Sequence, residues 1–230
     1  MKIIQISDSH ISIDRPARTA ELEACIRQIN AADTQPDAVV HTGDVAHDGL
    51  VEEYQVARDL LDTLAVPYYV LAGNRDNRQV LSEVFADGHC IKPGMEFIQY
   101  PVEQFETRLI CIDTVSGASN KGRLCTARLA HLESMLAADQ SRPTALFLHH
   151  PPFEVNVAPD PFQFEEWAEV DALQTLIRQH GQVCGIYCGH VHRQFESKIG
   201  SVEASVATCI ASDLRWDQVS SCVYTRSLPH

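Results

Sequence analysis

Short apolar runs alternate with longer stretches in which apolar residues recur every three or four positions along the first 85 residues. The short runs predict buried strands, and the longer stretches predict helices with one apolar face. We expect strands at 2–7, 37–41 and 67–71, and helices at 16–32, 51–65 and 79–85. Strands that alternate with helices are joined by right-handed crossovers, so this half of the chain predicts a largely parallel sheet.

The pattern changes after residue 96, where two strands follow each other before the next helix. We expect strands at 97–102, 108–113, 144–148 and 183–188, a helix at 126–138, a proline-rich loop at 151–161, a helix ending near residue 180, and a hairpin at 195–210 that turns at Gly200. No segment has the composition of a linker. We therefore predict an α/β fold of two packed mixed sheets flanked by helices. It forms a single domain of residues 1–230, with 195–230 as a C-terminal hairpin and tail.

The chain is acidic, since 18 Lys and Arg residues against 31 Asp and Glu residues give a net charge of −13. This balance disfavours a nucleic-acid or anionic-membrane binder that works through a broad basic surface. It does not disfavour a small phosphate substrate, because bound metal ions reverse the field in one cleft. The N-terminal apolar run is too short for a secretory signal, and no run approaches the roughly 18 to 20 apolar residues that span a bilayer. We expect a cytoplasmic protein whose eight cysteines are free thiols.

Residue types that ligate metals directly follow five of the predicted strands. The segments are 8–10 (DSH), 43–49 (GDVAHDG), 73–76 (GNRD), 149–152 (HHPP) and 189–192 (GHVH). Each segment alone is more often an ordinary turn. The carboxyl ends of strands in an open α/β sheet line one crevice, so we expect the five segments to converge. Five such segments in order have no economical explanation as independent turns, and together they predict a metal site.

This set of motifs resembles the calcineurin-like metallophosphoesterases, whose pattern is D-x-H, G-D-x-x-x-D-G, G-N-H-D/E, H-x-P and G-H-x-H. Within that superfamily the chain looks most similar to bacterial glycerophosphodiesterases and class III cyclic-nucleotide phosphodiesterases. The likeness extends to the stretches PDAVVHTGDVAHDG, EEYQVARDLL, TRLICID and FLHHPP. It covers residues from about 2 to 193, and it implies a four-layer α/β/β/α fold.

The resemblance implies two divalent metal ions that share one carboxylate. The first ion would be held by Asp8, His10, Asp44 and His192, and the second by Asp44, Asn74, His149 and His190. Such mixed carboxylate, imidazole and amide ligands suit Mn, Fe, Zn or Co. Two ions roughly 3.5 to 4 Å apart lower the pKa of a shared water and clamp a phosphoryl oxygen. The implied reaction is hydrolysis of a small phosphodiester, a glycerophosphodiester or a cyclic nucleotide, by metal-activated hydroxide.

Arg75 stands where the family has a histidine after Gly-Asn. Arginine cannot donate a proton at neutral pH, but its guanidinium binds phosphate oxygens in pairs. We expect Arg75 to stabilise charge with Asp76 orienting it, and to shift preference toward diesters with acidic leaving groups. Catalytic roles then fall on Asp44, Asn74, Arg75 and Asp76, and substrate contacts on Arg75, Asn74 and His150.

Alternatives to a phosphodiesterase stay open. The arginine at position 75 also fits a scaffold, that is, a protein that binds the metals but no longer hydrolyses a substrate. Every implied metal ligand is nevertheless intact. A nuclease of the same fold is disfavoured by the acidic balance and by the lack of a Lys and Arg stripe. No motif excludes a phosphomonoesterase. The expected partner is a small-molecule phosphodiester rather than a membrane or nucleic acid, and self-association through the C-terminal part is open.

Substrate identity is expected to depend on the loops after Pro151 and on the region beyond Ile210, where no diagnostic motif occurs. In these parts, Trp216 fits a subunit contact. The aromatic residues 162, 164 and 167 are expected mainly in the core.

Histidines outside the metal pattern are expected to have ordinary roles. His150 does not fit the H-x-P spacing, so packing or support of a metal ligand is favoured for it over substrate contact. The others are expected at the surface or in loops: His41, His47, His89, His131, His180 and His230.

Overall fold

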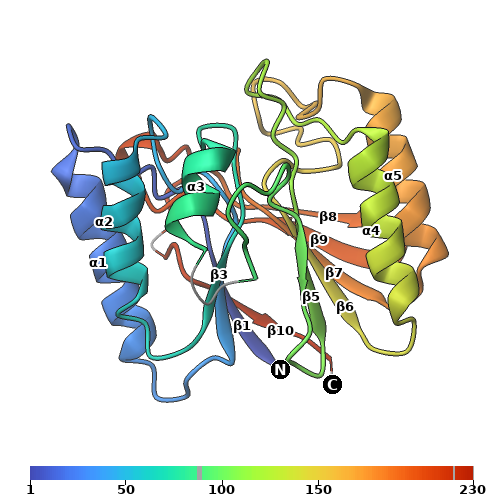
Figure 1. Cartoon of the computed structure of the whole chain (residues 1–230), viewed down its shortest axis with the longest axis horizontal. Coiled ribbons are helices and arrows are strands. Elements are labelled where there is room, and N and C mark those ends of the chain that lie inside the picture. The colour runs from blue at the N-terminus through green and yellow to red at the C-terminus, as the bar shows by residue number, and fades with distance from the viewer. Residues whose placement is uncertain (87–89, 220, 230) are drawn as a thin grey trace.

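The computed structural model describes residues 1–86, 90–219 and 221–229. Two β-sheets lie side by side in the middle of the molecule, and helices cover the outer face of each (Figure 1). The strand order is β10-β1-β2-β3 in the first sheet and β4-β5-β6-β7-β9-β8 in the second. The predicted arrangement of two packed mixed sheets between helices is confirmed.

The first sheet and its helices follow the predicted alternation. The elements are β1 (Lys2–Ile6), α1 (Pro16–Asn30), β2 (Ala38–His41), α2 (Val51–Leu61), β3 (Tyr68–Val70) and α3 (Arg78–Val84). Strands β1, β2 and β3 are parallel. Local sequence explains the helix starts: Pro16 opens α1, and the Asn77 side chain accepts hydrogen bonds from the first N–H groups of α3. The three strands therefore present their carboxyl ends at one edge.

The second sheet is built from the rest of the chain. Its elements are β4 (Tyr100–Val102), β5 (Arg108–Ile112), α4 (Thr126–Ala138), β6 (Thr144–Leu148), α5 (Trp167–Gln179), β7 (Val183–Cys188), β8 (Phe195–Ile199) and β9 (Val202–Val206). Strands β5, β6, β7 and β9 are parallel, and β4 and β8 are antiparallel edges. The predicted hairpin turns at Gly200, where φ is +62°, but its second strand ends four residues earlier than expected.

The tail contributes a strand that the sequence pattern does not reveal. After a short 3-10 helix, η1 (Ser212–Leu214), strand β10 (Tyr224–Ser227) pairs antiparallel with β1. Its four residues, YTRS, alternate between half-buried and exposed positions and carry one large apolar side chain, which is too short a signal to predict a strand. The tail is thus part of the first sheet.

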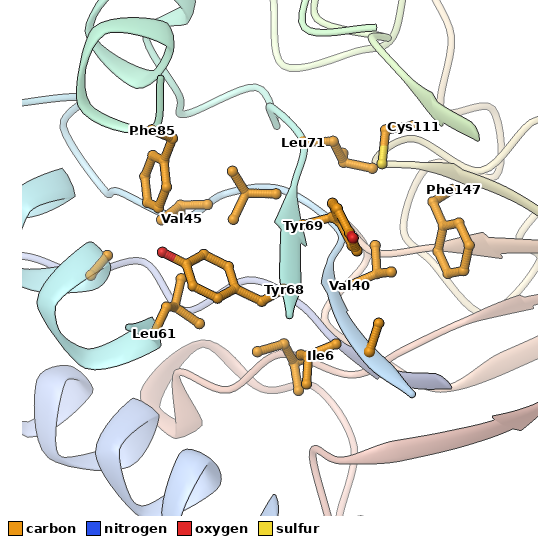
Figure 2. Packing of buried hydrophobic residues seen from close by; sticks show 14 of the residues in the cluster. Ile6, Val40, Val45, Leu61, Tyr68, Tyr69, Leu71, Phe85, Cys111 and Phe147 are labelled. Carbon is orange, nitrogen blue, oxygen red and sulfur yellow. The ribbon is translucent and has the colours of Figure 1, made fainter. Parts of the chain in front are cut away.

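The strands of the first sheet separate two layers of apolar packing. Consecutive residues of a strand point to opposite faces. Accordingly, Tyr68 of β3 points toward the helices, beside Phe85, whereas Tyr69 points toward the second sheet, on the side of Phe147 and Cys111 (Figure 2). The layer between the sheets fixes them against each other, so their strand ends hold a constant relative position.

Other sequence expectations have mixed outcomes. The eight cysteines are free, as expected, although Cys90 is exposed. Of the three aromatic residues expected mainly in the core, Phe164 is buried and Trp167 packs partly against the core, but Phe162 is 42% exposed. No helix among the described residues combines the length and the apolar character that crossing a membrane requires.

Candidate metal centre

Five parallel strands from both sheets end at one rim, and the metal-ligand segments follow them there. In the first sheet, Asp8, Asp44 and Asn74 come after β1, β2 and β3. In the second sheet, His149 and His190 come after β6 and β7. The backbone N–H of His190 donates to Asp8 Oδ2 over 3.1 Å, so a hydrogen bond joins the two sheets at this rim. The structure brings all five segments together.

The backbone is left-handed at five of the implied ligand positions. A positive φ is uncommon for residues other than glycine and costs about 1–3 kcal/mol. Among the described residues, the non-glycine residues with positive φ are Asp8 (56°), His10 (45°), Asp44 (52°), His190 (75°) and His192 (53°). Such strain persists where the surroundings impose it, and it clusters at functional sites. Backbone strain therefore marks the same site as the sequence motifs.

The first ligand cluster contains two carboxylates and two imidazoles. One ligand atom each of Asp8, His10, Asp44 and His192 lies within 4.8 Å of the others. His10 Nε2 is 3.5 Å from Asp44 Oδ2, and His192 Nε2 is 3.3 Å from Asp8 Oδ1. This cluster has the composition that the resemblance implies for the first ion.

The loop that contains η1 sets the protonation of His192. Its Nδ1 is 3.0 Å from the carbonyl oxygen of Leu214, and since a carbonyl only accepts, this nitrogen carries the proton. In the neutral ring, Nε2 then presents a lone pair toward Asp8 Oδ1. That oxygen is buried, and no described residue gives it a hydrogen bond. Two acceptors that face each other need a cation or a proton between them, so these residues fit a metal ion.

The second ligand cluster is rich in histidine. One ring nitrogen each of His149, His150 and His190 lies within 4.8 Å of the others. His149 Nδ1 is 2.8 Å from the Thr42 carbonyl oxygen and therefore donates to it, which leaves Nε2 on the side of Asp44 and Asn74. His149 Nε2 is 3.1 Å from Asn74 Oδ1.

Asp44 lies between the two clusters. Its Oδ2 is 3.5 Å from His10 Nε2 of the first cluster and 3.5 Å from His149 Nε2 of the second. The other oxygen, Oδ1, accepts the backbone N–H of Arg75 over 2.8 Å. This geometry suits a carboxylate that is shared between two ions.

His150 is engaged on both ring nitrogens by protein groups. Its Nε2 donates to the Asn120 carbonyl over 3.1 Å, which leaves Nδ1 to accept from the Thr114 hydroxyl at 2.8 Å. The Thr114 hydroxyl in turn accepts the backbone N–H of His150. The ring is fully buried. The structure therefore argues against the predicted substrate contact of His150 and gives it a packing role beside His149 and His190.

Without metal, the carboxylates of Asp8 and Asp44 keep this site negatively charged. Burial works to raise the pKa of Asp8, but His192 and His149 lower it to about 2. Burial works to lower the pKa of His149, but Asp44 and Asp8 raise it to about 9. At His10 burial outweighs the carboxylates, and the pKa falls to about 4. The site thus attracts a proton where no metal is bound.

The Arg75 side chain points away from the protein interior. The residue is exposed and lines the cavity beside the ligands, and among the described residues nothing forms a hydrogen bond or ion pair with its guanidinium. A guanidinium without a protein partner at this place is available to an anionic ligand.

Asp76 does not orient Arg75, contrary to the sequence-based prediction. Its buried carboxylate accepts the backbone N–H groups of Gly73 (2.8 Å), Ala46 (3.0 Å) and Val45 (3.2 Å). It also accepts the Tyr54 hydroxyl at 3.0 Å. Asp76 therefore ties the turn after β3 to the turn after β2, and it acts on the site by holding Asp44 and Asn74 in place.

Two glycines allow the turns to approach each other. A Cβ on Gly73 would fall on the side chain and backbone of Asp44. A Cβ on Gly189 would fall on the Ser7 hydroxyl and would lie 2.6 Å from Asp8 Oδ2. A side chain at either position would press on Asp44 or Asp8, which explains the glycines in Gly-Asn and Gly-His.

Sequence reasoning missed several residues around the site. Five of the seven implied ligands line a cavity of about 370 Å³, namely His10, Asp44, Asn74, His190 and His192. The same cavity is also lined by His47, Ser119, Asn120 and Leu214. The only available signal was the position of His47 in the GDVAHDG segment. Nothing in the segment around Asn120 predicts its place, since a loop between β5 and α4 carries it there.

The remaining histidines depart from the surface expectation in part. His41 is buried in β2, with Nε2 2.9 Å from the Ser9 hydroxyl, and His180 is buried at the end of α5. His131 is exposed, as expected. His89 and His230 lie outside the described residues.

Two adjoining clusters of possible ligands that share a carboxylate, at the ends of parallel strands from two sheets, fit the class of dinuclear metal-dependent hydrolases. The chain belongs to the calcineurin-like phosphoesterase family, whose model matches residues 1–194. It is 30% identical to a probable glycerophosphodiester phosphodiesterase of Arcobacter nitrofigilis, over 94% of this chain and 82% of that protein. It is 33% identical to a glycerophosphodiester phosphodiesterase of Enterobacter lignolyticus, over 84% of this chain and 71% of that protein.

A second group of relatives has a different substrate. The chain is 27% identical to the 3′,5′-cyclic adenosine monophosphate phosphodiesterase of Vibrio vulnificus, over 96% of this chain and 82% of that protein. Among solved structures, a dimetal phosphatase from Danio rerio matches with a TM-score of 0.72 at 14% identity, covering 91% of this chain and 88% of that one. The structural match supports the fold.

Proposed function

We propose that this chain is a dinuclear-metal phosphodiesterase that hydrolyses small phosphodiesters, either glycerophosphodiesters or cyclic nucleotides. The observation that carries the proposal is the pair of ligand clusters joined by Asp44 Oδ2, which is 3.5 Å from a histidine nitrogen of each. The names of the relatives supply the two substrate classes.

The seven implied ligands supply what two divalent ions need. Such ions, when bound, lower the pKa of water toward neutrality and withdraw charge from a phosphoryl oxygen. Two carboxylates, Asp8 and Asp44, balance only half of the four positive charges, so the loaded site is cationic and attracts an anionic diester. Hydrolysis then breaks one P–O bond and joins a water oxygen to phosphorus. An open-chain diester gives a phosphomonoester and an alcohol, whereas a cyclic diester opens to one product that carries both the phosphomonoester and the new hydroxyl.

Arg75 and Asn74 are the side chains that we place against the phosphate. The free guanidinium of Arg75 reaches oxygens that no ligand cluster holds, and it stabilises their charge in the transition state. It cannot protonate the departing alcohol, because it keeps its own proton at neutral pH. Diesters with acidic leaving groups therefore suit this site best.

The choice of metal and the compartment belong to the same proposal. The mixed ligands suit Mn, Fe, Zn or Co. Eight free cysteines are typical of a reducing compartment, which supports a cytoplasmic location.

The test is hydrolysis by the chain loaded in turn with Mn, Zn, Fe and Co. The substrates are bis(4-nitrophenyl) phosphate, glycerophosphoethanolamine, and 2′,3′- and 3′,5′-cyclic AMP. We expect turnover with at least one metal, and loss of about a thousandfold or more in Asp44→Asn, because several kcal/mol of charge stabilisation disappear at a factor of ten per 1.4 kcal/mol. A metal-loaded chain that hydrolyses none of these diesters would support the scaffold instead.

A further inference from the structure

A second cavity of about 320 Å³ adjoins the metal cavity. The two share Asn120 and the ligands His190 and His192. A phosphate held at the metal centre would therefore have one of its two ester groups directed toward the second cavity. The volume of the second cavity is that of an ordinary small-molecule site.

Apolar residues from two separate loops line part of this second cavity. Val157, Ala158 and Pro159 form one apolar wall and Trp216 contributes a second, while Asp160, Gln163 and Arg193 add polar groups. These are the two regions on which the sequence placed substrate identity without a motif. The side chains of Val157 and Trp216 are 41% and 56% exposed, so large apolar surfaces are left open beside a polar metal site.

Hydrogen bonds fix the two walls against each other. Arg193 Nη1 donates to the Val157 carbonyl over 2.6 Å, and Nη2 donates to the Trp216 carbonyl over 3.0 Å. The backbone N–H of Trp216 donates to the carbonyl of His192 over 3.0 Å. The indole is thus carried on a backbone that is tied to a proposed metal ligand, while more than half of the surface of Trp216 stays exposed.

The charged side chains that line this cavity are held in place by protein groups. The Arg193 guanidinium donates to the two carbonyls, and Asp160 forms an ion pair of 2.6 Å with Lys121. The exposed surface of Trp216 is therefore the contact that this cavity leaves open, and an indole favours a flat, uncharged group.

We propose that the second cavity binds a planar aromatic group of the diester, a nucleobase or an aryl ring, by stacking on Trp216. The inference rests on the proposed function and narrows it: cyclic nucleotides and aryl diesters are substrates, whereas glycerophosphodiesters, which lack a flat ring, gain nothing from this cavity.

Trp216→Ala tests the proposal and keeps both backbone hydrogen bonds of residue 216. We expect kcat/KM to fall about tenfold for 3′,5′-cyclic AMP and bis(4-nitrophenyl) phosphate, which is the lower part of the range for a base stacked on an aromatic side chain. The loss should appear in KM, because a group remote from the reacting atoms binds ground state and transition state alike. Trp216→Phe should restore most of it, and glycerophosphoethanolamine should be unaffected.

Ile13→Ala is the matched control, since Ile13 is also 56% exposed and lines neither cavity. It should leave all rates unchanged. Equal losses on aromatic and non-aromatic substrates in Trp216→Ala would overturn the inference, and so would a selective loss on glycerophosphocholine, which would identify a cationic occupant. Absence of all hydrolysis by the metal-loaded wild type would instead defeat the proposed function.

A binding measurement separates ring stacking from catalysis. The chain has two tryptophans, so Trp167→Phe leaves Trp216 as the only indole emitter. We expect 5′-AMP to quench its fluorescence and glycerol 3-phosphate to leave it unchanged. Equal responses to both would contradict stacking.

Discussion

The two ligand clusters differ in charge although they share a carboxylate. The first contains Asp8 beside Asp44 and two histidines, whereas the second adds to Asp44 no further carboxylate but the Asn74 amide and histidines. In the first, a buried carboxylate oxygen and a histidine lone pair face each other without a proton donor. In the second, His149 stays protonated without metal because Asp44 and Asp8 raise its pKa despite burial.

This difference predicts unequal affinities for divalent ions. The first site offers two negative charges to a cation, although Asp8 and Asp44 also raise the pKa of its His192 against the effect of burial. The second offers one shared charge and must release a proton from His149. We therefore expect the first site to fill at lower metal concentration than the second.

The largest effect should come from removing the carboxylate that distinguishes the first site. Asp8→Asn should weaken the tighter metal affinity by more than about a hundredfold, which exceeds what loss of a merely supporting partner costs. Asn74→Ala should weaken only the second affinity, and by less. Equilibrium dialysis with metal analysis measures both. If Asn74→Ala weakened the tighter site as much as Asp8→Asn, the assignment of ligands to clusters would be wrong.

The next effect concerns Arg75, whose backbone N–H holds Asp44. A histidine there can donate a proton, and general acid catalysis contributes about a hundredfold or more to reactions with poor leaving groups. Arg75→His should therefore raise kcat for alkyl diesters relative to aryl diesters. The slope of log kcat against leaving-group pKa reports this directly. An unchanged slope would remove Arg75 from leaving-group selection.

The proton on His149 makes binding at the second site pH-dependent. Its pKa is raised to about 9 in the metal-free chain, so below that pH the ring must lose a proton to bind metal. Affinity should rise about tenfold per pH unit up to that value, for one proton released. Calorimetric titration in two buffers of different ionisation enthalpy counts the protons. Affinity that is flat from pH 6.5 to 8.5 would contradict a protonated His149.

The smallest effect should be confined to stability. Thr114→Val removes the hydroxyl that bonds His150 and leaves a buried ring nitrogen unpaired, at a cost of about 1–3 kcal/mol in the free energy of unfolding. Urea denaturation measures it, and bound metal should remain unchanged. Thr175→Val on exposed α5 is the control, expected within about 0.5 kcal/mol of wild type. If Thr114→Val bound less metal than the wild type, His150 would have to be counted among the metal ligands.

Sequence alone was enough for most of the fold because the strands that matter are short apolar runs. A run such as residues 144–148 is buried on both faces and leaves no competing interpretation. Strand β10 was not predicted, because its four residues form a strand only by pairing with β1, which lies more than 200 positions away in the sequence. Its place depends on tertiary contact and leaves no local periodicity.

The candidate site was partly predictable for a similar reason. Ligand positions follow strands, so their convergence comes from topology and can be expected from order along the chain. The role of Asp76 could not be predicted, because the groups that it binds are backbone N–H groups, which every residue except proline has. The second cavity was equally hidden, since Val157 and Trp216 are far apart in the sequence and are joined by hydrogen bonds from Arg193.

The left-handed turns at Asp8, His10, Asp44, His190 and His192 have a consequence for protein engineering. Even at about 1 kcal/mol each, they amount to about 5 kcal/mol, which is as large as the whole net stability of many domains. Grafting the same seven side chains onto a relaxed scaffold would therefore not transfer the centre. The bent main chain aims the ligands, and only a host with stability to spare could tolerate it.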